Sequence, residues 1–158
     1  YGNAFSMATA EQVKAATNPL SPPTMSNILA ISAPPDGWGE YSREEMLNVL
    51  TTAYAGFSAA HQESKRLVPD FSRTVIHTGF WGCGAFGGNR RLMTILQALA
   101  ADLADVEIVF WAFDESRVKL ARDAHQVYER LRDSTPTVDH FLGLLLQEKF
   151  EWGVSDGN

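Results

Sequence analysis

The chain has 158 residues, of which 45% are hydrophobic and 20% charged, and its formal net charge is −6. This length and composition fit one domain with a buried core, and no apolar run reaches the roughly 18 residues of a membrane span. The negative charge argues against general nucleic-acid binding, which relies on a basic surface, and the single cysteine, Cys83, excludes an internal disulfide.

Two segments precede the first predicted helix. Residues 1–27 are small and polar and contain three prolines, which predicts an irregular connector. Residues 27–32 (NILAIS) form a short apolar run that ends before Pro34 and Pro35. Such a run predicts a short buried strand, because proline ends regular pairing.

A helix and a second strand follow. Ser42 with Glu45 three residues later is a capping-box pattern, and the apolar residues after it recur at helical spacing. The pattern predicts a helix over 43–61. After a loop, residues 73–77 (RTVIH) are rich in β-branched side chains and predict a strand.

Residues 79–88 (GFWGCGAFGG), here named the glycine turn, contain five glycines in ten positions. Asn89 is suited to cap a helix, and Leu92, Leu96, Leu99 and Leu103 recur at the spacing of a helix that packs one face on a sheet. The continuous apolar run of 107–113 (EIVFWAF) predicts a third strand, covered on both sides.

Two further helices are predicted near the C-terminus. Asp114 or Ser116 can cap a helix over 116–132, and Pro136 suits the first turn of a helix over 136–150. Strands that alternate with helices predict an α/β fold, with a parallel or mixed sheet flanked by helices on both faces. We expect a core over 28–150 and a tail over 151–158. Three strands are few, so we expect part of the domain to lie upstream.

The glycine turn is the strongest functional signal. Glycines allow a ligand to approach the main chain, and consecutive N–H groups near a helix start suit a diphosphate. The alternative is a tight turn with no ligand. Gly82, Gly84 and Gly87 match the dinucleotide-binding fingerprint formally, but the turn is crowded by bulky side chains and the next strand ends further on than the usual distance of about 20 residues. A phosphate-binding P-loop is excluded, because no Gly-Lys-Ser/Thr follows.

The segment 78–88 resembles the signature of the poly(ADP-ribose) glycohydrolase family, Thr-Gly-Asn-Trp-Gly-Cys-Gly-Ala-Phe-Gly-Gly, at ten of eleven positions. Residues 50–57, 92–101 and 110–113 are similar to further segments of that family, as are Thr137-Val138 and 144–146. The resemblance implies a macrodomain-like fold that binds ADP-ribose or poly(ADP-ribose). We expect no cofactor and no metal. The resemblance implies these ligand-binding residues: Tyr1, Phe80, Gly82, Cys83, Gly84, Ala85, Phe86, Gly87 and Phe113.

The resemblance also assigns roles. Gly84, Ala85 and Phe86 would wrap the diphosphate, and Phe113 would lie against the adenine. Phe80 stands where the family has asparagine, so a polar contact near the ribose is lost. The catalytic Gly-Gly-Gly then Gln-Glu-Glu signature is absent from 1–158. In the family it lies upstream, and its glutamic acid protonates the leaving oxygen of a ribose–ribose bond.

Three functions therefore remain open at this point. The first is an inactive portion of a poly(ADP-ribose) glycohydrolase, completed by an upstream segment or a second chain; the second is an ADP-ribose-binding module without hydrolysis. The third is a nicotinamide-binding protein. In each case we expect an intracellular protein, nuclear or cytoplasmic, with no contact to a membrane.

Other reactive side chains have simpler interpretations. Glu44 and Glu45 are better explained as acids of a helix start than as a catalytic pair. Cys83 is better explained as a buried side chain than as a nucleophile. The four histidines, His61, His77, His125 and His140, show no metal-ligand spacing. His77 can be a hydrogen-bonded strand-end residue or touch a ligand, and Arg90 and Arg91 can face solvent or assist a phosphate.

Overall fold

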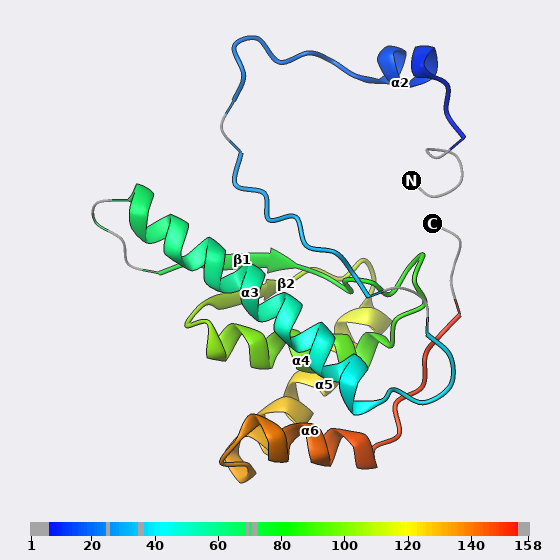
Figure 1. Cartoon of the computed structure of the whole chain (residues 1–158), viewed down its shortest axis with the longest axis vertical. Coiled ribbons are helices and arrows are strands. Elements are labelled where there is room, and N and C mark those ends of the chain that lie inside the picture. The colour runs from blue at the N-terminus through cyan, green and yellow to red at the C-terminus, as the bar shows by residue number, and fades with distance from the viewer. Residues whose placement is uncertain (1–6, 25, 35–36, 69, 71–72, 155–158) are drawn as a thin grey trace.

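The computed structural model describes residues 7–24, 26–34, 37–68, 70 and 73–154. Tyr1 lies outside these ranges. The elements follow one another as α2 (Ala10–Ala16), α3 (Arg43–Leu67), β1 (Val75–Thr78), α4 (Arg90–Leu103), β2 (Glu107–Phe110), α5 (Glu115–Ser134) and α6 (Val138–Gln147). Figure 1 shows α3 crossing in front of the strands, and α6 on the side of α4 and α5 that faces away from the strands. The predicted α/β fold class is confirmed.

β1 and β2 form a parallel pair joined by α4, in the register Val75–Glu107 to Thr78–Phe110. β2 is shorter than the strand expected over 107–113. Its pairing stops at Phe110 because β1 stops at Thr78, where the glycine turn begins. One more main-chain bond, from the Trp111 amide to the Thr78 oxygen at 2.8 Å, closes this end of the ladder.

The expectation that this strand is covered on both sides is wrong for the described residues. Ile108 and Phe110 are half-buried toward the helices, but Val109 is 37% and Trp111 63% exposed on the opposite face. Burial along both strands alternates, as expected where one face packs on helices and the other has no described element over it. One face of the sheet is therefore open.

The N-terminal segment differs from the prediction in two ways. Residues 27–32 form no strand, and Ile28 is 80% exposed. Leu29 and Ile31 of this run lie on α3 instead: a Cβ at Gly56 would stand 2.7 Å from Ile31 and 3.3 Å from Leu29. Residues 10–16, expected to be irregular, form α2, because Thr9 and Gln12 make a capping box that the connector interpretation overlooked. α2 buries no side chain and extends away from the other helices (Figure 1).

The predicted helix starts are largely confirmed. Ser42 and Glu45 form the expected capping box on α3, which runs on to Leu67 rather than ending near residue 61. Asp114 caps α5. α6 begins at Val138 with Thr137 as its cap, so Pro136 precedes the helix instead of opening it.

α4 is the centre of the core. It packs against α3, α5 and β2, and every side chain from Leu92 to Ala101 is buried. The sequence predicted a helix with one buried face. The other faces are also buried because α4 lies between two helices as well as against the sheet, which its small residues, Ala98, Ala100 and Ala101, allow. α4 therefore holds the glycine turn at its start firmly in place.

Candidate functional site

The glycine turn leaves the carboxyl end of β1, and Phe113 follows the carboxyl end of β2. The two strands are parallel, so both features lie at the same edge of the sheet. A Cβ placed on Gly79 would stand 3.2 Å from the main-chain oxygen of Trp111, which shows how closely the two segments approach. Ligands of open α/β sheets bind at this edge.

The backbone of the turn requires glycine at several positions. Gly82 has φ +72° and Gly87 has φ +62°, a conformation that side chains with a Cβ rarely adopt. A Cβ on Gly88 would stand 2.7 Å from the main-chain oxygen of Gly82. The chain thus folds back on itself in a space that admits no further atom.

Hydrogen bonds close the turn at both ends and leave its middle open. The Cys83 amide donates to the Phe80 oxygen at 3.0 Å, the Gly87 amide to Gly84 at 3.1 Å and the Gly88 amide to Gly82 at 2.9 Å. The amides of Gly84, Ala85 and Phe86 have no acceptor among the described residues. Three successive N–H groups without a partner, beside a helix start, are suited to an anion.

Asn89 joins the turn to α4. Its side-chain oxygen accepts from the amides of Arg91 and Leu92, both at 3.1 Å, which confirms the predicted cap. Its side-chain nitrogen donates to the Glu151 oxygen at 2.9 Å, and its main-chain amide donates to the Tyr41 hydroxyl at 3.1 Å. The side chain and the main-chain amide of Asn89 thus connect the start of α4 to Tyr41 and to Glu151.

The sequence prediction missed Gln97, which holds the beginning of the turn. Gln97 is 1% exposed in the middle of α4. It accepts from the Thr78 hydroxyl at 2.7 Å and donates to the main-chain oxygen of Gly79 at 3.1 Å. The available signal was a polar residue within the apolar run from Ile95 to Ala101, since buried polar side chains are normally hydrogen-bonded.

We expect Gln97→Leu to lower the free energy of unfolding by about 1–3 kcal/mol, because the Thr78 hydroxyl and the Gly79 oxygen lose a buried partner while the side-chain volume is kept. Chemical denaturation monitored by circular dichroism measures the change. Gln126→Leu, at an exposed position of α5, is the matched control and should leave stability nearly unchanged. Equal stability of the two variants would contradict the role assigned to Gln97.

Phe80 packs into the fold. Its ring meets Phe110 edge-on at 5.0 Å between centroids, and the Arg90 guanidinium lies 6.0 Å from the ring centre. The side chain is half-buried against the core. Arg90 therefore contacts an aromatic face, a contact that the sequence alternatives of solvent or phosphate did not include.

Phe113 is 92% exposed, and a single described contact, from the Arg117 guanidinium at 5.9 Å, reaches its ring. The residue lies between the end of β2 and Asp114, the cap of α5. A large aromatic ring exposed to solvent at the carboxyl edge of the sheet is available to stack on a flat apolar group.

Cys83 is buried in the turn and is 5% exposed. Burial raises the pKa of its thiol to about 12, so the reactive thiolate is scarce at neutral pH. The interpretation as a buried side chain is confirmed. Any contribution of Cys83 to binding would come from its main chain.

We expect the native chain to resist alkylation of Cys83 by iodoacetamide at pH 8, and to react fully once guanidinium returns the thiol pKa to about 8.5. The same shift makes stability fall above pH 8.5 and toward pH 12, because the unfolded chain loses this proton first. Mass spectrometry of the labelled protein measures the reaction. Labelling of the native chain as fast as of the unfolded chain would contradict the burial.

The acids of the α3 start take structural roles. The Ser42 amide donates to the Glu45 carboxylate at 2.7 Å, and the Trp152 indole donates to the same carboxylate at 3.1 Å. Glu44 is exposed in the first helical turn. The interpretation of this pair as helix-start acids is confirmed.

His77 accepts a hydrogen bond from the Trp111 indole at 3.0 Å on the open face of the sheet. The interpretation as a hydrogen-bonded strand-end histidine is thus confirmed. Across the described part of the chain, no group of three or more His, Cys, Asp or Glu side chains gathers as a metal site would require. Within the same residues, no helix has the length and apolar character needed to cross a membrane.

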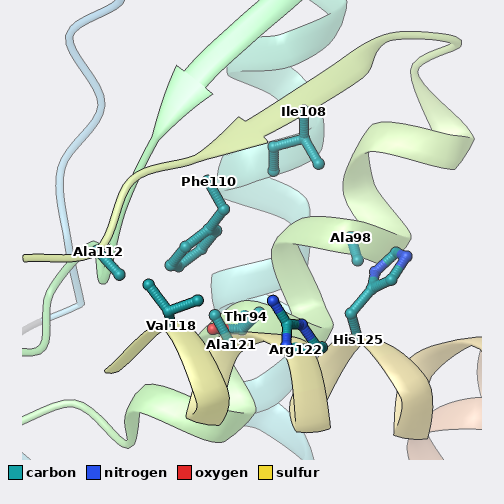
Figure 2. A pocket seen from close by; sticks show the side chains of 9 residues that line it. All are labelled: Thr94, Ala98, Ile108, Phe110, Ala112, Val118, Ala121, Arg122 and His125. Atoms are coloured by element: carbon teal, nitrogen blue, oxygen red, sulfur yellow. The ribbon is translucent and has the colours of Figure 1, made fainter. Parts of the chain in front are cut away.

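A cavity of about 280 Å³ lies on the helix-covered side of the sheet. Figure 2 shows Ile108 and Phe110 of β2 pointing toward Val118 and Ala121 of α5, with Arg122 and His125 further along α5. Neither Phe113 nor any residue of the glycine turn lines this cavity, although Ala112, the neighbour of Phe113, does.

Comparisons with known proteins show which family this chain resembles. Residues 1–120 match the model of the family described as poly(ADP-ribose) glycohydrolase with a macro domain fold. Poly(ADP-ribose) glycohydrolase 1 of Caenorhabditis elegans is 35% identical over 93 residues, which cover 56% of this chain and 12% of that protein. Poly(ADP-ribose) glycohydrolase 2 of the same organism is 31% identical over 100 residues, covering 58% of this chain and 19% of that protein.

The aligned parts are thus a small fraction of both relatives, whereas the family model covers most of this chain. The family model identifies the family and its fold, and its match extends over the glycine turn, α4, β2 and Phe113. The chain belongs to the poly(ADP-ribose) glycohydrolase family and carries part of its macro domain fold.

Proposed function

We propose that this chain binds ADP-ribose at the edge formed by the glycine turn and Phe113. The amides of Gly84, Ala85 and Phe86 hold the diphosphate, and the ring of Phe113 lies against the adenine. The observation that carries this proposal is the pairing of three amides without an acceptor among the described residues with an aromatic ring 92% exposed at the same edge. Family membership supports the same ligand.

The proposed reaction of the complete protein is hydrolysis of ribose–ribose bonds in poly(ADP-ribose). Such hydrolysis needs a carboxylic acid that is still protonated near neutral pH, within hydrogen-bond reach of the leaving oxygen. We propose that an upstream segment supplies this acid, and that the 158 residues alone bind without hydrolysing. The mechanism requires no cofactor.

The pKa shifts of two acids, Asp114 beside Phe113 and Glu45 at the start of α3, support this division. Hydrogen bonds from the Ser116 hydroxyl and the Arg117 amide lower the pKa of Asp114. Burial alone would raise the pKa of Glu45, but hydrogen bonds from Ser42 outweigh it and the net pKa is lowered. Both carboxyl groups are therefore ionised at neutral pH and have no proton to give to a leaving oxygen.

The upstream segment, or a second chain, is proposed to cover the open face of the sheet. Val75, Val109 and Trp111 are exposed there, although the faces of parallel sheets are normally both covered. Covering this face would bring the added segment beside the edge where Phe113 lies. We propose an intracellular location, in the nucleus or the cytoplasm, for the assembled protein.

Isothermal calorimetry with ADP-ribose, ADP and NADH tests the binding proposal. We expect saturable binding of ADP-ribose and no turnover of poly(ADP-ribose) by the isolated chain, with turnover restored when the upstream segment is present. Binding without restored turnover would favour the alternative, a non-catalytic ADP-ribose-binding module. Tight NADH binding with no affinity for ADP-ribose would overturn the proposal in favour of a nicotinamide protein.

A further inference from the structure

Residues 150–153, here named the C-terminal strap, lie beyond the part of the chain that matches the family model. The sequence predicted a tail from residue 151. Instead, the strap runs across the back of the glycine turn: the Gly153 amide donates to the Gly87 oxygen at 2.7 Å, and the Glu151 oxygen accepts from the Asn89 side chain at 2.9 Å. Both contacts lie where the turn passes into α4.

Trp152 attaches the strap to the start of α3 and to the segment that precedes this helix. Its ring stacks on Tyr41 with 4.2 Å between centroids and 11° between planes, and its indole N–H donates to Glu45 at 3.1 Å. The indole lies against Gly37, where a Cβ would stand only 2.0 Å from a ring atom. Main-chain bonds from Tyr41 to Phe150 at 2.8 Å and from Trp152 to Gly39 at 2.8 Å complete the attachment.

Tyr41 links Trp152 to the end of the glycine turn. Its hydroxyl accepts the Asn89 amide at 3.1 Å, while its ring carries Trp152. The strap thus holds Gly87 and Asn89 through hydrogen bonds, and Tyr41 holds Asn89 through a further one. These residues lie at the exit of the same loop whose middle amides, those of Gly84, Ala85 and Phe86, have no acceptor among the described residues.

We infer that Trp152 is a positioning residue for the anion-binding amides, acting through Tyr41, Gly87 and Asn89. The inference rests on the proposed ADP-ribose function. A loop already held in its binding geometry does not lose conformational freedom when the ligand arrives, so preorganisation appears directly as affinity. The strap supplies that geometry from outside the loop.

Trp152→Ala is the first test. We expect the dissociation constant for ADP-ribose to rise about tenfold, the scale of ordering one or two side chains and a loop. Amide hydrogen exchange at Gly87 and Gly88 should accelerate, while exchange in the buried centre of α4 stays unchanged. Trp38→Ala is the matched control, since Trp38 is 96% exposed one residue before Gly39, and it should change neither quantity.

Two conservative variants keep the test decisive if Trp152→Ala does not fold. Trp152→Phe keeps a ring on Tyr41 and should recover most of the affinity. Tyr41→Phe keeps the ring stack on Trp152 and removes only the acceptor of the Asn89 amide. It should therefore weaken ADP-ribose binding and accelerate amide hydrogen exchange at Asn89.

Adenosine separates positioning of the amides from a general structural effect, because it has the base but no diphosphate. We expect its affinity, measured by NMR titration, to be unchanged in each variant. Equal losses for adenosine and ADP-ribose, or unchanged exchange at residues 87–89, would overturn the inference. Failure of the unsubstituted chain to bind ADP-ribose would instead refute the proposed function, and the exchange data would still report whether the strap holds the turn.

Discussion

Replacing Phe113 with alanine is expected to weaken ADP-ribose binding by about 5- to 140-fold, because stacking of a base on an aromatic ring is worth about 1–3 kcal/mol. The free energy of unfolding should not change, since the ring is 92% exposed and buries little apolar surface. Calorimetry gives the first quantity and chemical denaturation the second.

Phe113→Tyr is the control for this prediction, because it keeps a flat ring at the same position. It should bind ADP-ribose nearly as well as the unsubstituted chain. If the alanine and tyrosine variants bound ADP-ribose as tightly as the unsubstituted chain, the adenine would have to lie elsewhere. The proposed contact between Phe113 and the adenine would then be wrong.

Gly88→Ala should have the second large effect, on both folding and binding. The added Cβ would stand 2.7 Å from the Gly82 oxygen, which is main chain and has little room to shift. The Gly88 amide donates to that same oxygen, so the bond that closes the turn is lost with the movement. We expect a loss of about 1–3 kcal/mol in the free energy of unfolding, typical of overpacking, and no measurable ADP-ribose binding.

Gly143→Ala, in the interior of α6, is the matched control for the same chemical change. A Cβ there meets nothing within 4 Å. Alanine in a helix loses less conformational freedom on folding than glycine, so this variant should be more stable by about 0.5–1 kcal/mol. A Gly88→Ala variant that is as stable as the unsubstituted chain would show that the turn is looser than the structure indicates.

Local chemistry made several parts of this molecule predictable from the sequence. Ser42 with Glu45, Asn89 and Asp114 were recognised as helix caps because each side chain bonds to amides within three residues of itself. The glycine turn was recognised for the same reason: its five glycines lie within ten residues, and their effect on the backbone needs no distant partner.

Features that depend on distant partners were not predictable. Leu29 and Ile31 of the apolar run 27–32 pack on Gly56 of α3 rather than pairing in a strand, and nothing in the run itself distinguishes these outcomes. The same limit applies to Gln97, whose partners Thr78 and Gly79 lie 18 or 19 residues away, and to Trp152, whose partner Glu45 is 107 residues away. The site was therefore predicted as a loop, but not as a loop held by Gln97 and the C-terminal strap.

The proposed binding of a diphosphate by the glycine turn is tested most directly by NMR titration of the isotope-labelled chain with ADP-ribose and, separately, with adenosine. We predict large shifts of the Gly84, Ala85 and Phe86 amide signals with ADP-ribose and small shifts of the same signals with adenosine. Saturating ADP-ribose that leaves these three amides unmoved, or that moves the cavity residues Ala98 and Ala121 instead, would contradict the account.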